Sequence, residues 1–131
     1  MKKSKIVLFS FFIGLIATFL ILRYVYKDHR DIATESASFS LVSTELITEF
    51  TTDAETATKK YLDQTVELSG TVSSISDSYF TLNQSIVCYT DSISISKLTS
   101  SQAIKAKGRF IGYDDLLGEI KFDQVTIIQQ Q

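Results

Sequence analysis

The residues that build most catalytic and metal sites are scarce in this sequence. It has one cysteine, Cys88, and one histidine, His29, and it contains no proline and no tryptophan. A single cysteine excludes an internal disulfide. His29 lies beside a long apolar run near the N-terminus, far along the chain from Cys88, so Cys88 has no plausible catalytic partner. We expect its thiol to behave as a small buried apolar group.

Sequence motifs for catalysis are absent as well. The chain has no G-x-x-x-x-G-K-S/T phosphate loop, no G-x-S-x-G nucleophile turn and no H-E-x-x-H zinc motif. Asp114, Asp115 and Glu119 gather around an expected turn, but they lack the D-x-D-x-D spacing of a calcium loop. A solvated turn is the simpler interpretation. We therefore predict a protein that is not an enzyme and that has no cofactor and no metal site.

Charge is missing from one long stretch, Ile6 to Leu22, and the apolar character continues to Tyr26. At about 1.5 Å per residue, residues 6–26 would span roughly 31 Å as a helix, which matches one hydrocarbon core. This predicts that residues 1–27 form an uncleaved membrane anchor. A cleaved signal peptide is an alternative, although its apolar core is usually only about 7–15 residues long. A buried core helix is a third possibility.

The flanks of this run bear on its orientation. Three lysines precede it within residues 2–5, and three basic residues follow it within residues 23–30, so the count of basic residues does not decide the orientation. A short basic tail ahead of an anchor usually stays in the cytoplasm, which would place the C-terminal domain on the other side. We therefore expect a single-pass protein of the inner (cytoplasmic) membrane with a periplasmic, extracytoplasmic domain.

Positive charge is scarce beyond the anchor. Residues 28–131 contain eight basic and all 15 acidic side chains, a net charge of −7. An acidic domain repels phosphate backbones unless it keeps a segregated basic patch. The charge therefore argues against a nucleic-acid partner.

The rest of the chain divides into a polar tether and one folded domain. Residues 28–41 are polar and rich in small residues, and we interpret them as the tether. The domain, residues 42–131, begins with apolar side chains at helical spacing, namely Leu46, Ile47, Phe50, Ala54, Ala57 and Tyr61. Asp53 could cap a second helical segment. We expect one bent helix or two short ones, with an apolar face that covers the following part of the domain.

From residue 65 the apolar period changes to two, which is typical of strands. Five strand candidates follow in order, at residues 65–75, 78–82, 85–90, 103–114 and 118–128. Residues 91–102 permit a strand, a loop or a short helical turn. Five strands preceded by a helix predict a mainly β domain in which the strands close into a small barrel.

Two of the chain's few glycines stand in the middle of expected strands. Gly70 interrupts the first strand and Gly108 the fourth. A glycine in a strand interior weakens pairing, but it lets a strand bend sharply, as the closure of a small barrel requires. We therefore predict a bending role for both. The alternative is that each glycine only lets a neighbouring side chain pack closely.

The part of the chain that follows the tether resembles a known family. The segments "AETATKKYLDQTVELSGTVSSI", "VCYT" and "IKAKGRFIGYDD" are similar to the tRNA anticodon-binding-domain-like (tRNA_anti-like) proteins of bacteria, over about residues 42–128. The resemblance implies a five-stranded OB-fold barrel in a short exported or membrane-anchored protein. The sequence departs from the pattern in residues 91–102, where Ser100 or Ser101 replaces a turn glycine and the usual helix is not evident.

An OB barrel commonly binds ligands on the face of its second and third strands. Here that face would present Tyr79, Phe80 and Tyr89, whose rings could stack on bases or sugars. The alternative is that Phe80 belongs to the core and that the two tyrosines are ordinary half-buried strand residues. We predict Tyr79 and Tyr89 as ligand-binding residues.

One basic stripe runs along the expected fourth strand. Lys105, Lys107 and Arg109 alternate and so share one face of the strand, and Lys121 could join them to bind an anion or a phosphate. The alternative is a solvated outer face on which these cations pair across strands with acids such as Glu119 and Asp123.

The function predicted from these features is a binding or interaction module of the bacterial envelope. It would be held in the membrane through residues 6–26, with a protein, a peptide or a glycan as its ligand. The main alternative is a nucleic-acid-binding OB domain that faces the cytoplasm. A structural accessory subunit of a membrane complex is a further possibility.

Overall fold

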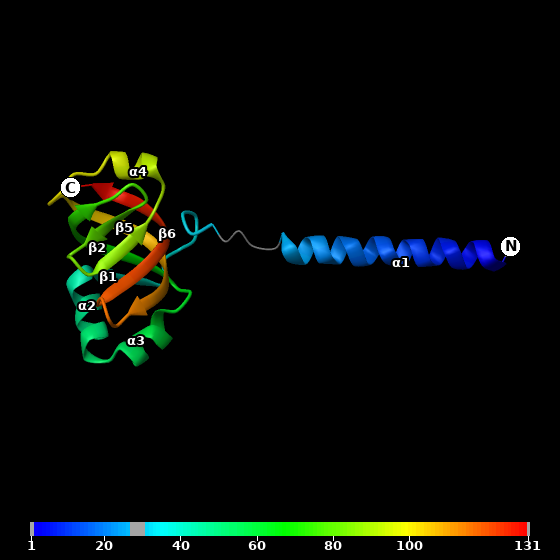
Figure 1. Ribbon diagram of the computed structural model, residues 1–131, viewed down its shortest axis with the longest axis horizontal. Helices are drawn as coiled ribbons and strands as arrows, with labels where there is room; N and C mark the ends of the chain where they lie inside the picture. The colour runs from blue at the N-terminus through cyan, green and yellow to red at the C-terminus, as the bar shows by residue number, and fades with distance from the viewer. Residues whose placement is uncertain (1, 27–30, 131) are drawn as a thin grey trace. The chain divides into compact units, whose positions relative to one another are not determined.

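The chain contains two separate compact units. The computed structural model describes residues 2–26 and 31–130, with the side chains of residues 129 and 130 left aside. The division falls between Asp31 and Ile32 (Figure 1). The first unit holds one helix, α1 (Lys2–Val25), which is long and apolar enough to cross a membrane. This helix confirms the long apolar N-terminal helix expected from the sequence.

The second unit is a barrel with short helices. Its elements in chain order are β1 (Phe39–Val42), α2 (Ser43–Thr52), α3 (Ala54–Tyr61), β2 (Thr65–Ile75), β3 (Tyr79–Leu82), β4 (Ile86–Tyr89), α4 (Ser92–Ser96), β5 (Ala103–Asp114) and β6 (Glu119–Gln130). In Figure 1, α3 and α4 lie at opposite ends of the barrel. The prediction of a mainly β domain preceded by helical residues is confirmed.

Five strands close on one another. The pairings run β2–β3–β4–β6–β5, and β5 pairs back with β2. All of these pairs are antiparallel except β4–β6, which is parallel. The β3–β4 connection turns at Asn83 and Gln84, whose φ angles of 47° and 65° are those of a tight hairpin turn. The predicted five-stranded barrel of OB type is therefore confirmed.

A sixth strand was not expected. Residues 39–42 form β1, which pairs in parallel with residues 66–69 of β2. Ile32 is only 1% exposed, and the Ser38 amide donates to the Thr65 carbonyl at 2.8 Å. The described part of the expected 28–41 tether is therefore largely built into the barrel unit, because its backbone satisfies the edge of β2. Residues 28–30, including His29, lie outside the described residues.

The predicted helical segment consists of two helices, α2 and α3. Asp53 separates them, and its carboxylate accepts hydrogen bonds from the Thr56 amide (3.2 Å) and the Thr56 hydroxyl (2.7 Å). These bonds favour the charged form and lower the pKa of Asp53. The buried positions of the two helices, Leu46, Phe50, Ala57 and Tyr61, join the core. Local capping chemistry and the apolar face thus place the helices as the sequence indicated.

The ambiguous stretch 91–102 contains a short helix, α4. Asp91 caps it by accepting from the amide and the hydroxyl of Ser94, at 2.9 and 2.8 Å. Ile95 is 7% exposed, so one side of α4 is covered. Ser101 then adopts a φ of 67°, a left-handed conformation that favours glycine. The expected turn therefore forms at this serine.

The core fills the inside of the barrel. Its largest side chains are aromatic, and Phe110 contacts both Phe50 and Phe122 with ring centroids 5.3 and 5.7 Å apart. Phe80 is fully buried, so it belongs to the core, which was the alternative to a ligand-binding role. Cys88 is also buried, and burial raises the pKa of its thiol well above the ordinary value. The expectation of a small buried cysteine is confirmed.

Candidate ligand-binding face

Two of the predicted site residues are direct neighbours. Tyr79 on β3 and Tyr89 on β4 are cross-strand partners, and their ring centroids lie 5.6 Å apart with planes inclined at 58°. The next pair along the ladder, Phe80 and Cys88, is buried in the core. Because side chains alternate along a strand, the tyrosines lie on the outer face. Tyr89 is 38% exposed, so this face offers an aromatic surface.

The backbone at this end of the barrel is firmly held. The Thr90 amide donates to the Ser78 carbonyl at 3.2 Å, and the Thr90 hydroxyl donates to the Val125 carbonyl at 2.7 Å. The Ser76 amide donates to the Tyr79 carbonyl at 2.8 Å. These bonds fix both strands next to the tyrosines, so the two rings are presented by rigid elements.

The chain segment that carries the tyrosine pair is acidic. Residues 76–96 include Asp77 and Asp91 and contain no lysine or arginine. The carboxylate of Asp91 is occupied by its bonds to Ser94, which lower its pKa. A ligand on this face would therefore meet aromatic rings and acidic neighbours from this part of the chain, a setting that does not favour phosphate.

The basic stripe is paired along its length. Lys105 lies 3.1 Å from the Glu67 carboxylate, and Arg109 makes two hydrogen bonds to Asp123, at 2.9 and 2.6 Å. Lys105 and then Ser40 lower the pKa of Glu67 through hydrogen bonds to its carboxylate. Cations held by cross-strand acids are poor phosphate ligands, so the structure supports the alternative interpretation of a paired outer face.

Lys107 has a different partner. Its ammonium donates to the backbone carbonyls of Ala33 and Glu35, at 2.9 and 2.7 Å. The Glu35 carboxylate in turn accepts from the Thr65 hydroxyl at 2.9 Å. Lys107 therefore fastens the segment that precedes β1 onto the barrel. No local sequence pattern predicts this role, because the two partners are more than seventy residues apart.

The acids at the β5–β6 turn surround the fourth cation. The Lys121 ammonium lies 3.7 Å from Asp114 and 3.8 Å from Glu119. Among residues 2–26 and 31–130, the structure holds no group of three or more His, Cys, Asp or Glu side chains arranged for a metal ion. The turn is thus a partly neutralised surface feature.

The two predicted structural glycines are both closely packed. A methyl group on Gly70 would lie 2.3 Å from Ser43 Oγ and 2.6 Å from Asn83 Oδ1. On Gly108 it would lie 2.7 Å from Val125 Cγ2. These contacts correspond to the alternative reading, in which glycine permits close approach. The bending role stays a prediction; Gly70 lies where β2 changes partner from β5 to β3.

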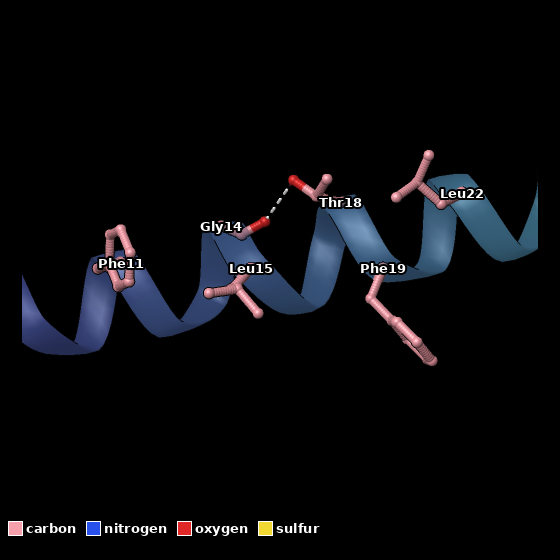
Figure 2. Close-up of a pocket in the computed structure, with 6 residues that line it drawn as sticks. All are labelled: Phe11, Gly14, Leu15, Thr18, Phe19 and Leu22. Atoms are coloured by element: carbon pink, nitrogen blue, oxygen red, sulfur yellow. Dashed lines mark hydrogen bonds between the residues drawn. The ribbon is translucent and has the colours of Figure 1, made fainter.

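Two hollows are lined by residues other than the tyrosine pair. One, of about 340 Å³, follows the junction of α2 and α3 and is lined by Thr48, Glu49, Thr52, Asp53, Thr56, Ala57 and Lys60. The other, of about 480 Å³, is a dip on α1 where Gly14 has no side chain (Figure 2). There the Thr18 hydroxyl donates back to the Gly14 carbonyl at 2.8 Å. This dip belongs to a single helix surface.

Comparison with known proteins gives two results. The barrel resembles the crystal structure of a protein described as a "putative nucleic acid-binding lipoprotein" from Klebsiella pneumoniae subsp. pneumoniae, with a TM-score of 0.60 and 14% sequence identity. The match covers 78% of this chain and 98% of the other, and at that identity it shows the fold alone. A search of curated proteins finds no match. The family model named tRNA_anti-like matches residues 1–108, and the chain therefore belongs to the tRNA_anti-like family.

Proposed function

We propose that this chain is a non-enzymatic binding module of the bacterial envelope. In this proposal α1 anchors it in the cytoplasmic membrane, the barrel lies on the extracytoplasmic side, and the face around Tyr79 and Tyr89 binds a peptide or a glycan. The observation that carries the proposal is the outward pair of tyrosine rings, 5.6 Å apart, on two firmly bonded strands.

The position of the pair supports a binding role. OB barrels commonly bind ligands on the strands that correspond to β3 and β4. Tyrosine adds contact area with little loss of conformational entropy and keeps a polar hydroxyl for hydrogen bonding. A pair of rings at this place, of which Tyr79 is half-buried and Tyr89 is 38% exposed, can cover one face of a sugar ring or a flat side chain.

Nucleic acid is the second candidate ligand. The Klebsiella protein is described as nucleic acid-binding, which favours this candidate, and aromatic rings on an OB barrel can stack on bases. The charges oppose it, because residues 28–131 carry a net charge of −7 and the basic stripe is engaged with Glu67, Asp123 and backbone carbonyls. A phosphate backbone would have to displace those partners. We therefore rank it below peptide and glycan.

Attachment to the membrane is supported by the length and composition of α1. The helix has 24 residues, its stretch from Ile6 to Leu22 has no charge, and none of its side chains is buried in the protein. The Klebsiella protein is also described as a lipoprotein. A cleaved signal sequence is the alternative for such a helix.

Binding by the full-length chain in phosphatidylcholine nanodiscs tests the ligand class. The probes are a soluble chitooligosaccharide, a labelled oligolysine peptide and a labelled oligouridylate. We expect the glycan or the peptide to bind, and the double substitution Tyr79→Ala and Tyr89→Ala to weaken binding at least tenfold, since one stacking ring contributes about 1–3 kcal/mol. Lys105→Ala is the control and should change little. Tight oligouridylate binding that Lys105→Ala abolishes would support the nucleic-acid alternative instead.

A further inference from the structure

Two leucines stand exposed at the tip of the β5–β6 hairpin. Leu116 is 92% exposed and Leu117 is 67% exposed. The loop that carries them, residues 115–118, joins the last rung of the ladder, Asp114 opposite Glu119. Leu116 is therefore almost as accessible as it would be in an unfolded chain, although both ends of its loop are fixed by strand pairing.

The turn itself is held by specific bonds. The Asp114 carboxylate accepts from the amides of Leu116 and Leu117, at 3.0 and 3.2 Å. Gly118 closes the loop with a φ of 67°, a conformation that suits glycine. The turn chemistry therefore presents both leucines outward in a defined geometry. Covering two adjacent exposed leucines at the tip of an ordered turn with an apolar environment lowers the free energy.

The short link to α1 indicates what covers them. Only residues 26–31 separate Val25, the end of α1, from Ile32, which is fixed in the barrel unit at 1% exposure. Seven residue-to-residue steps join Val25 to Ile32, each at most about 3.3–3.6 Å long, so Ile32 stays within roughly 25 Å of the end of α1. A domain of about 100 residues has a radius of gyration near 13 Å. The link is thus short enough to keep the loops of the barrel close to the headgroups.

Charge at the tip is compatible with an uncharged lipid surface. The carboxylate of Asp114 is bonded to two backbone amides, and Asp114 and Glu119 both face the Lys121 ammonium. Asp115 adds one more acid beside the leucines. The acidic surroundings favour zwitterionic over anionic headgroups, because like charges repel near a lipid surface.

We propose that Leu116 and Leu117 form a second membrane contact, inserting at the boundary between headgroups and acyl chains of the bilayer that holds α1. This inference rests on the proposed membrane anchor. Once one part of a chain is held in a membrane, a second weak contact strengthens the attachment, because it forms at high effective concentration. Such a contact would fix the orientation of the barrel, and with it the direction in which the tyrosine pair faces.

A fluorescent probe on the hairpin tests this proposal. The full-length chain with Leu117→Cys is labelled with an environment-sensitive nitrobenzoxadiazole group and reconstituted into phosphatidylcholine vesicles that contain a shallow nitroxide lipid. Cys88 is buried with a raised thiol pKa, so it should stay unlabelled. We expect a blue shift and loss of fluorescence through nitroxide quenching. Both effects should diminish when Leu116→Gln is added or phosphatidylglycerol replaces part of the lipid.

Two further labelled positions separate the possible outcomes. Ser76→Cys, in the exposed turn between β2 and β3, is the matched barrel control. Tyr24→Cys, near the end of α1, reports the anchor. The lipid contact would be overturned if the probe at Tyr24 is quenched but the probe at Leu117 is quenched no more than the one at Ser76. That result would leave the anchor in place and would point to a protein partner for the hairpin. Absence of quenching at both Tyr24 and Leu117 would overturn the membrane anchor as well as the lipid contact of the hairpin.

Discussion

At the scale of single residues, one close contact decides what Gly70 does. Ser43, the first residue of α2, is fully buried, and its hydroxyl has no hydrogen-bond partner among the described residues. This hydroxyl fills the space where a Gly70 side chain would begin. The contact joins the start of α2 to the middle of β2. Gly70 therefore has a packing reason as well as its predicted bending role.

Replacing Gly70 with alanine should destabilise the barrel by about 1–3 kcal/mol, the usual cost of overpacking a closed site. Gly112→Ala is the matched control, because nothing lies within 4 Å of its added methyl group, and it should be neutral or slightly stabilising. Adding Ser43→Ala to Gly70→Ala should recover part of the loss, since it removes the shortest contact. Thermal melts of the full-length variants measure this. Equal melting temperatures for Gly70→Ala and Gly112→Ala would refute the packing role.

At the scale of elements, the junctions are set by side chains that satisfy free backbone groups. Asp53 begins α3, Asp91 begins α4, and Asp114 organises the β5–β6 turn. Each carboxylate accepts from amides two or three residues ahead, as short-range capping requires. The junction before β5 is different, because Ser101 has a positive φ without the freedom of glycine.

Substitution of Ser101 tests this junction. Ser101→Gly should stabilise the protein by up to about 1 kcal/mol, because relief of left-handed strain exceeds the extra entropy of an unfolded glycine. The bond from the residue 101 amide to the Val72 carbonyl, 2.8 Å, should persist. Ser100→Gly is the control and should destabilise by several tenths of a kcal/mol, since no strain is relieved there. Urea titration separates the two, and a more stable Ser100→Gly variant would contradict the turn geometry.

At the scale of the whole molecule, the two units follow different physical rules. α1 buries none of its side chains in the protein, and its length and composition suit a lipid environment. The barrel unit buries an apolar core of its own, and residues 28–131 carry a net charge of −7.

Topology is the whole-molecule prediction. Fused after Gln131, alkaline phosphatase should be active and a fluorescent protein that matures only in the cytoplasm should be dark, because the short basic tail favours the cytoplasm. The intact mass of the membrane-bound product should include residue 1, since we expect no cleavage. The reverse reporter pattern would place the barrel in the cytoplasm and strengthen the nucleic-acid alternative. A shortened product would identify α1 as a cleaved signal.

The sequence by itself determined those features that depend on local chemistry. The uncharged run from Ile6 to Leu22 made α1 an apolar helix, and Asp53 capped α3 across three residues. Alternation of apolar residues located β2 and β5, and shorter strand-like segments located β3, β4 and β6. Such patterns can be recognised in a sequence because the helical and strand periods span only about two to four neighbouring residues.

Only the tertiary structure decided which distant residues meet. β1 forms in a polar segment because the edge of β2 accepts it, and Lys107 reaches back to Ala33. The register of β5 against β2 and β6 paired Lys105 with Glu67 and Arg109 with Asp123, so these cations of the stripe already have carboxylate partners. No local pattern encodes such partners, because strand register depends on barrel closure and on packing between segments that are far apart in the chain.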